Sequence, residues 1–383
     1  MKKTLIIIAF SLGLSSFSAQ RLFKNVPLKS PALDETSGLL LYNNVVITHN
    51  DSRGNPDLYE VNLETGSVSR TVVVKDATNI DWEDITQDQH FIYVGDIGNN
   101  EGNRKDLKIY KISKADYNDG DDTVTPEIIR YYYEDQTDFK SRVNNNNWDA
   151  EALISYNDQL LIFTKNWADN QVNVYAVPKV ADHTHRAVKV SIYNTKGMIT
   201  GADVSPDHKK IFLTGYSTAA PPFLFTVTNI PTGSYDVFSG QVSEKKANLL
   251  PMGNQVEGIT IVSTSKNKHE ILISNEKYTV SFGPLTFTFP AKLWSLELEN
   301  EDVTLAASAA GSTPTFSIYP NPFQNILKLT KKADEIQIYD LAGKLITTKV
   351  LVDEIQLGHL QAGTYMARIK MGDEVFIKKL IKK

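Results

Sequence analysis

The chain has 383 residues, of which 41% are hydrophobic and 22% charged, and a formal net charge of −5. This composition describes a folded protein rather than a disordered one, and the length favours two domains of unequal size. The acidic balance argues against a nucleic-acid-binding surface, and the absence of cysteine excludes thiol catalysis, zinc–cysteine sites and disulfides.

The first 19 residues have the pattern of a secretion signal. Two lysines precede the apolar run Leu5 to Phe10, and small residues follow up to Ala19. The apolar run is too short to span a bilayer, so we expect a signal peptide cleaved after Ser18 or Ala19. No later stretch is expected to cross a membrane.

A short pattern recurs five times between residues 20 and 300, at intervals of roughly 50 residues. In each copy an acidic residue opens an apolar segment, and a second apolar segment ends in polar residues, as in Glu83-Asp-Ile85 before FIYVGDIGNN. The segments alternate with period two, and no long helical period is present. We therefore predict an all-β fold with a β-propeller, five blades being preferred and six possible. Leu22 to Leu28 would supply the outer strand of the last blade and close the ring.

Five acids open the five copies of the pattern: Glu35, Glu83, Glu151, Asp203 and Glu257. The first residues of the innermost strands meet at the mouth of a propeller's central channel, so we expect these five to converge there. Such carboxylates repel one another unless some are protonated or a cation neutralises them, and calcium suits an oxygen-rich site. The sequence thus predicts a calcium site. The alternative is that each acid caps backbone amides at the mouth.

Polar side chains follow the second strand of each unit and would rim the same mouth. Mixed Arg, Lys and Asn suit an anionic or hydroxyl-rich ligand, although turns commonly contain such residues in any case. The candidate ligand-binding residues are Asn50, Asp51, Arg53, Asp96, Asn99, Asn100, Lys165, Asn166, Trp167, Asn275, Glu276 and Lys277.

A separate C-terminal unit follows an Ala-, Ser- and Thr-rich stretch, residues 301–315, which is expected to be a linker. Residues 316–383 alternate as strands and predict a small β-sandwich. The motifs YPNPF at Tyr319 to Phe323, IYDLAGK at Ile338 to Lys344 and LQAGTY at Leu360 to Tyr365 resemble the type A sorting domain of the type IX secretion system. The resemblance implies export through the periplasm, recognition by the secretion and sorting machinery, and release or anchoring at the cell surface. An accessory module, such as a carbohydrate-binding one, is the alternative.

The repeats also resemble a known class of enzyme. NDSRGNPDLYEVN at Asn50 to Asn62, together with the acid-led copies, is similar to the five-bladed calcium-activated nucleotidases, or apyrases. The resemblance implies calcium beside a nucleotide, with Arg53 at a basic position and four acids at the acidic positions: Glu35, Glu83, Glu151 and Glu257. The copy around Asp203 departs from the pattern, with Gly201-Ala202 before the acid. Six-bladed phytase-like and gluconolactonase-like propellers share the same Glu-Gly-aliphatic element.

Two classes of function therefore remain open from the sequence. An enzyme would be a metal-assisted hydrolase, for example of phosphate esters. The alternative is a non-enzymatic propeller that recognises a glycan, peptide or protein partner, or serves as a cell-surface scaffold, and holds a purely structural ion. The chain contains no Gly-rich phosphate loop, no G-x-S-x-G and no H-E-x-x-H. His183 and His185 lie in a polar connection without an acidic third ligand nearby, so we expect a solvent-exposed loop there.

Overall fold

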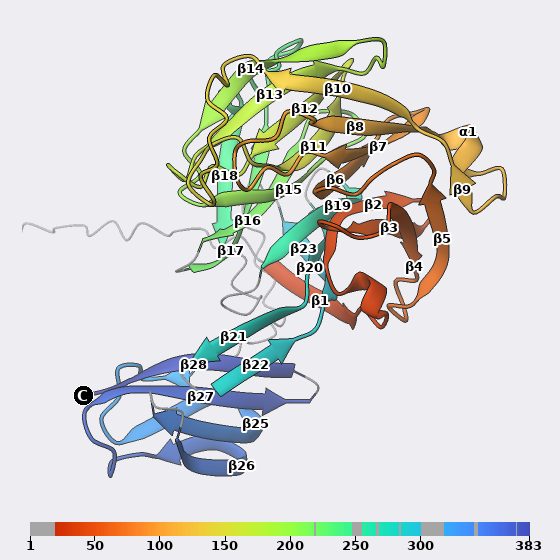
Figure 1. Cartoon of the computed structure of the whole chain (residues 1–383). Helices are drawn as coiled ribbons and strands as arrows, with labels where there is room; N and C mark the ends of the chain where they lie inside the picture. Colours follow the sequence, from red (N-terminus) through yellow and green to blue (C-terminus); the bar gives the residue numbers. More distant parts are fainter. Residues whose placement is uncertain are drawn as a thin grey trace, which may run out of the picture.

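The computed structural model describes residues 20–217, 220–246, 255–265, 268–282, 285–299, 318–340, 344–372 and 374–383. The predicted signal segment (1–19) and the predicted linker (301–315) lie outside the described residues. Strands dominate both parts of the chain (Figure 1).

Five four-stranded antiparallel blades form the larger part, which confirms the five-bladed propeller. Each blade is built in the order inner to outer strand. Blade 1 contains β2 (Thr36–Tyr42), β3 (Val45–Asn50), β4 (Asp57–Val61) and β5 (Val68–Val74). Blade 2 contains β6 (Trp82–Gln87), β7 (Phe91–Asp96), β8 (Lys108–Ser113) and β10 (Glu127–Tyr133). Blade 3 contains β11 (Ala150–Tyr156), β12 (Gln159–Thr164), β13 (Val172–Pro178) and β14 (Thr184–Tyr193). Blade 4 contains β15 (Met198–Val204), β16 (Ile211–Ser217), β17 (Ala220–Thr228) and β18 (Gln241–Lys246).

Blade 5 joins the two ends of the propeller segment. It consists of β19 (Val256–Thr264), β20 (Lys268–Asn275), β23 (Lys292–Glu299) and β1 (Gln20–Pro27). The first strand, β1, pairs antiparallel with the last, β23, so that Val26 lies opposite Leu293. The inner strands β2, β6, β11, β15 and β19 contact one another in sequence, and β19 contacts β2. The ring is thereby closed by an N-terminal strand, as predicted, and the outer edge of the last blade is covered.

Short strands, a hairpin and helical turns are added to the blades. The short strand β9 (Thr123–Val124) adds in parallel to β5, and β10 pairs in parallel with β14, which links blades 2 and 3 at their outer edges. The hairpin of β21 (Tyr278–Phe282) and β22 (Leu285–Phe289) projects from blade 5 (Figure 1). The helical turns are η1 (Pro31–Leu33), α1 (Lys114–Tyr117) and η2 (Val237–Ser239).

The propeller core lies between neighbouring blades, and strand position determines the burial pattern. Every residue of inner strand β11 is buried, whereas outer strand β10 alternates buried and exposed residues. Inner strands of adjacent blades are not neighbours in any sheet, so polar side chains form hydrogen bonds to backbone amides between the blades. The carboxylate of Asp84 accepts from Leu153 N at 2.9 Å, and Thr260 Oγ1 accepts from Leu41 N at 3.1 Å.

The C-terminal part forms a β-sandwich-like unit from one continuous sheet. Its strands are β24 (Ile318–Tyr319), β25 (Ile326–Asp340), β26 (Leu345–Gln356), β27 (Gly363–Met371) and β28 (Glu374–Lys382). The long strand β25 pairs with β24 near its start, with β27 from Glu335 onward, and with β26. Phe323 of the YPNPF motif is 1% exposed, and its backbone bonds Ile381 and Lys383 at 2.8 Å. No helix among the described residues is long and apolar enough to cross a membrane.

Candidate functional site

A β-bulge lies at the start of each inner strand, and in four of the five blades the residue at the bulge lines the mouth of the channel. The pairing of inner and second strands skips at the same place in all five blades, for example between Trp82 and Asp84 and between Ala150 and Ala152. Bulges re-aim side chains and commonly border functional sites. The residues that directly follow the last pair before the bulge are Ser37, Glu83, Glu151, Thr200 and Glu257.

The bulge register corrects two of the five predicted acids. Glu35 lies two residues before the bulge position of blade 1, is exposed, and does not line the cavity described below. Asp203 lies three residues beyond the bulge position of blade 4, where its carboxylate accepts from Ile261 N at 2.8 Å and from Thr260 Oγ1 at 3.1 Å. The expectation that all five acids converge is therefore wrong. Ser37 and Thr200 occupy the equivalent positions, because the repeats differ by two or three residues in register.

The sequence analysis missed Asp81 in blade 2 and Asp149 in blade 3, which occupy the position that Glu35 has in blade 1. In each of the three blades, the backbone oxygen of this acid accepts from an amide just after the second strand: Glu35 from Asp51 N at 2.9 Å, Asp81 from Ile97 N at 3.1 Å and Asp149 from Lys165 N at 2.8 Å. The three positions are therefore equivalent. The missed signal is the spacing Asp-x-Glu, which occurs at Asp81-Trp-Glu83 and again at Asp149-Ala-Glu151. It brings two carboxylates from the same strand start to the mouth.

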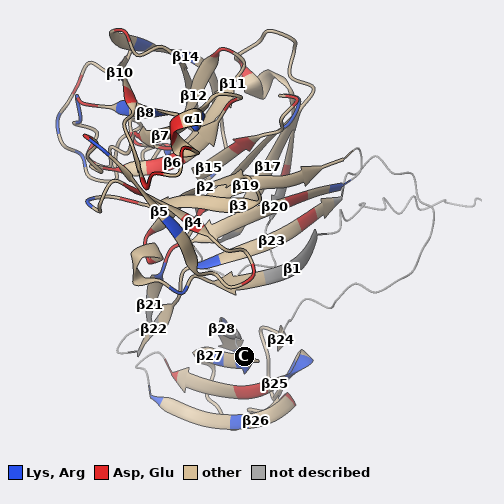
Figure 2. Ribbon diagram, turned by 90° about the vertical axis from the view of Figure 1, so that its right-hand side faces the viewer, with Lys and Arg blue, Asp and Glu red and all other residues tan. Residues whose placement is uncertain are grey.

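A cavity of about 190 Å³ opens at this end of the channel. Residues from all five blades contribute to it, and the lining contains five carboxylates but a single lysine. The lining residues are Thr36, Ser37, Asp51, Glu83, Asn100, Asn144, Glu151, Lys165, Trp167, Tyr216, Gln255, Glu257 and Glu276. Elsewhere on the propeller, acidic and basic residues are interspersed (Figure 2), so this excess of carboxylates is a local feature.

Two largely buried carboxylates face the cavity and accept no hydrogen bond from the described residues. Glu83 is 3% exposed and Glu257 is 8% exposed, and both line the cavity. Oδ1 of Asp51 is likewise buried without a partner. A Cβ on Gly98 would lie 2.1 Å from Glu83 Oε1 and 2.5 Å from the Asp81 carboxylate, so only glycine leaves room for this pair of acids. Buried anionic groups that lack donors are costly unless a cation compensates them.

The pKa values of these acids report the same excess of negative charge. Burial raises the pKa of Glu151 to about 8, against the opposing effect of Lys165. Burial together with neighbouring acids raises the pKa of Asp51 to about 7 and that of Asp81 to about 6. The pKa values of Glu83 and Glu257 are raised well above their usual range, again chiefly by burial. Without a cation, the cluster takes up protons near neutral pH.

The single lysine of the cavity lies beside the acids and two aromatic rings. Lys165 Nζ lies 2.8 Å from Glu151 Oε1, 4.9 Å from the centroid of the Trp167 ring and 5.6 Å from that of Tyr216. Burial alone would lower the pKa of Lys165, but the nearby carboxylates raise it well above its usual value. Trp167 Nε1 donates to Asp149 Oδ2 at 2.7 Å, and Asn99 N donates to Asp149 Oδ1 at 2.6 Å. Asp149 and Glu151 are thus supplied with donors, unlike Glu83 and Glu257.

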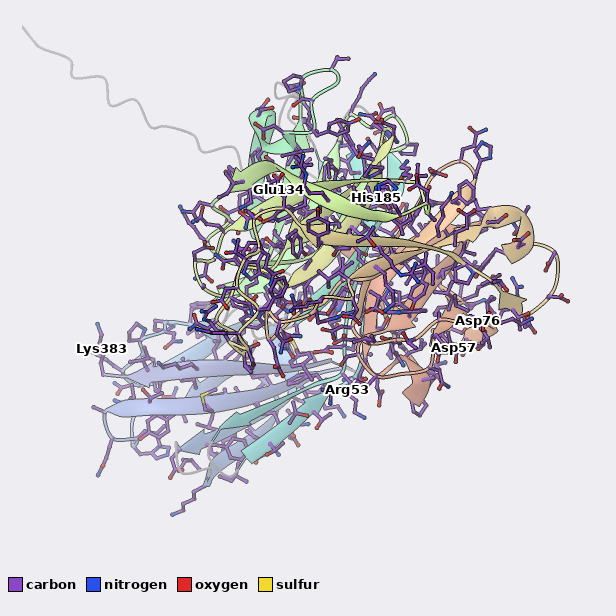
Figure 3. The ribbon with its side chains drawn as sticks, turned by 45° about the horizontal axis from the view of Figure 1, so that its top comes forward. Arg53, Asp57, Asp76, Glu134, His185 and Lys383 are labelled. Atoms are coloured by element: carbon purple, nitrogen blue, oxygen red, sulfur yellow. The ribbon has the colours of Figure 1, made fainter. Side chains whose placement is uncertain are left out.

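The structure brings together five of the twelve predicted ligand-binding residues in this cavity: Asp51, Asn100, Lys165, Trp167 and Glu276. The other seven do not line it. Arg53 is exposed on the turn after β3 (Figure 3), and Lys277 is exposed and paired with Asp34 at 2.7 Å. Asp96 is buried between Arg104 at 2.8 Å and Lys108 at 3.1 Å.

The remaining four residues have structural bonding patterns. Asn99 Oδ1 accepts from Arg104 N at 3.0 Å, and Asn166 Oδ1 accepts from Thr164 Oγ1 at 2.6 Å. Asn275 Oδ1 accepts from Trp294 Nε1 at 2.5 Å, and the backbone oxygen of Asn50 accepts from Asn79 Nδ2 at 3.0 Å. The expectation that these seven residues rim the ligand site is corrected, since none of them lines the cavity. The side chains of Asp96, Asn99, Asn166 and Asn275 instead bond to neighbouring residues.

Carboxylates at the mouth form two three-membered groups whose oxygens lie within 4.8 Å of one another. One consists of Asp51, Asp81 and Glu83, and the other of Glu83, Asp149 and Glu151. Glu83 belongs to both. The donor set is all oxygen, which fits calcium and does not fit the nitrogen and sulfur preferences of zinc or copper.

Comparison with known proteins decides the nature of the C-terminal unit. Residues 317–383 match the family model described as "Secretion system C-terminal sorting domain". The C-terminal unit is a type IX sorting domain. This match confirms the prediction made from the YPNPF, IYDLAGK and LQAGTY motifs. The domain marks the protein for export and for the cell surface or release, and it implies interaction with the secretion machinery.

The sorting domain is preceded by a propeller whose similarities are structural and distant. No curated protein matches the chain. A hypothetical protein from Leishmania major is 11% identical, with 72% of this chain and 90% of that chain covered and a TM-score of 0.39. A protein described as a candidate TolB from Agrobacterium tumefaciens is 12% identical, with 86% and 87% covered and a TM-score of 0.34. These similarities carry no functional argument.

Proposed function

We propose that the propeller of this exported protein holds a calcium ion at the channel mouth and uses it to bind a small anionic or polar ligand. The observation that carries the proposal is the pair of carboxylate groups that share Glu83, with Glu257 lining the same cavity. The Glu83 side chain is more than nine-tenths buried and accepts no hydrogen bond from the described residues. Glu83 is the central ligand, because it belongs to both carboxylate groups.

The oxygen donors of the cavity fit the demands of calcium. Calcium takes six to eight oxygen ligands at about 2.3–2.6 Å, from carboxylates, amide carbonyls and water. The lining offers carboxylates together with the amides of Asn100, Asn144 and Gln255 and the hydroxyls of Thr36 and Ser37. These donors leave room for water or a ligand atom on the ion.

The size of the cavity and the residues beside the acids favour a small ligand group. The volume of about 190 Å³ is smaller than the roughly 300–1,000 Å³ of typical drug-sized pockets. An ion with its waters and one phosphate, carboxylate or sugar hydroxyl group fills such a space, and the rest of a larger ligand would lie outside the mouth. Lys165, Asn100 and Trp167 supply a charge, donors and a flat apolar surface beside the ion.

Thermal unfolding of the mature chain, residues 20–383, tests the calcium site. Calcium binds only the folded state, so it should stabilise by about 2.7 kcal/mol at 100 times its dissociation constant, and chelator should remove this gain. Glu83→Gln combined with Glu257→Gln should abolish the response. Glu64→Gln is the matched control, since this exposed acid lies on the turn between β4 and β5 and does not line the cavity, and it should respond like the parent. A parent protein indifferent to chelator and to millimolar calcium would refute the proposal.

A hydrolysis assay then separates catalysis from binding. A metal-assisted hydrolase should release phosphate from nucleotides or aryl phosphates only when calcium is present, and the double Gln variant should be inactive. Calcium-dependent binding without turnover would assign the propeller to the recognition of a glycan, peptide or partner.

A further inference from the structure

A second group of potential metal ligands lies on blade 3, at the connection between β13 and β14. It consists of Asp182, His183 and His185. His185, labelled in Figure 3, is the second residue of β14 and lies opposite Tyr131 of β10. Its side chain is 6% exposed. The expectation of a solvent-exposed loop is wrong for His185, and Asp182 supplies the acidic group that was expected to be missing.

The three side chains already converge on one point. Asp182 Oδ1 lies 2.7 Å from His183 Nδ1 and 3.3 Å from His185 Nε2, and the two imidazole centroids are 4.2 Å apart. With zinc–ligand bonds of about 2.0–2.2 Å, two ligands of a tetrahedral ion stand about 3.4 Å apart. The three groups therefore need only small adjustments to hold one ion.

We infer that Asp182, His183 and His185 form a zinc site, distinct from the channel mouth and independent of the proposed function. Two imidazoles and a carboxylate suit zinc, which binds nitrogen and oxygen ligands in tetrahedral geometry, whereas calcium prefers oxygen ligands alone. The side chains of Asp182 and His183 are 57% and 65% exposed, so the fourth position is open to water.

The surroundings of His185 hold its ring in place and lower the affinity for zinc, because zinc binding would break hydrogen bonds. Its Nε2 lies 2.6 Å from the carbonyl oxygen of Val180. A ligating nitrogen carries no proton, so zinc binding releases hydrogen bonds that the histidines donate to Asp182 or Val180. The ion would tie the turn after β13 to the start of the outermost strand of blade 3.

Zinc titration of the tag-free mature chain by calorimetry tests the inference. Saturating calcium is present throughout to occupy the channel carboxylates. We expect one zinc ion per chain, and at least tenfold weaker binding after His183→Ala or Asp182→Asn, since both side chains are exposed and their loss leaves the core intact. His185→Gln, with folding checked by circular dichroism, should have the same effect.

The control is His90→Ala, which removes an exposed histidine from another turn and should bind zinc like the parent. The calcium response should persist in every one of these variants. Zinc binding that survives His183→Ala, or a parent chain that binds no zinc, overturns the inference without touching the channel site.

Discussion

Lys165 Nζ lies 2.8 Å from Glu151 Oε1 inside the channel cavity, and the two side chains are only 7% and 6% exposed. The charge of Lys165 also opposes the burial that raises the pKa of Glu257, whereas the charged neighbours of Glu83 are all acids. Within the described part of the chain, the protein's own groups therefore leave Glu83 as the carboxylate for an external cation.

Replacing Lys165 with Met should destabilise the calcium-free protein and tighten its calcium binding. Removing one partner of a buried pair leaves an uncompensated charge, at a cost of about 3–5 kcal/mol, and calcium is then attracted more strongly. Unfolding with chelator and calcium titration measure the two effects. Lys277→Met, which breaks only the exposed pair with Asp34, is the control and should change both little. Calcium binding that weakens in Lys165→Met would contradict this account.

Stability of the calcium-free protein should fall as pH rises from about 4 to about 8. Carboxylates whose folded-state pKa is raised bind protons more tightly in the folded state, so their stabilisation is complete below the unfolded pKa near 4. It is lost as pH passes the folded values, about 6 for Asp81, about 7 for Asp51 and about 8 for Glu151. Calcium should flatten this dependence, because it replaces the protons. Melting curves across pH with chelator and with calcium measure both; a chelator curve that rises over this range would be incompatible with the cluster.

Gly98→Ala should weaken calcium binding. The added Cβ would meet Glu83 Oε1 at 2.1 Å and the Asp81 carboxylate at 2.5 Å, and would push these ligands out of place. Gly54→Ala is the matched control, because its nearest neighbours would be 3.7 Å away. Calorimetry should show at least a tenfold loss of affinity for Gly98→Ala alone, and equal affinities in the two variants would show that Glu83 and Asp81 do not bind the ion.

Deleting residues 317–383 should leave a folded propeller that is no longer delivered to the cell surface or the medium. Among the described residues, the buried cluster of the sorting domain contains no propeller residue, and the five propeller clusters contain none from the sorting domain. Fractionation locates the protein, and the melting temperature of the purified propeller reports its fold. Normal delivery of the truncated chain would remove the sorting role.

Local patterns in the sequence were sufficient for the fold. Period-two segments at regular spacing predicted the five blades, and Leu22 to Leu28 was predicted to close the ring because the last blade lacked an outer strand. Both predictions rest on the hydrophobic alternation of strands, which each segment carries by itself. The sorting domain could also be predicted from local patterns, since its turns and strands follow one another within 70 residues.

The composition of the site was decided by tertiary structure. Three of the five predicted acids were placed at the mouth by the sequence, but Glu35 and Asp203 were misplaced. A β-bulge changes which residue faces the channel by one position, and the two-residue offset in blade 1 puts Ser37 there instead of Glu35. The pair of Lys165 and Glu151 forms within blade 3, but the two carboxylate groups that share Glu83 join blade 2 to Asp51 of blade 1 and to Glu151 of blade 3. Such contacts arise only when the closed ring brings the strand starts together, so no local pattern encodes them.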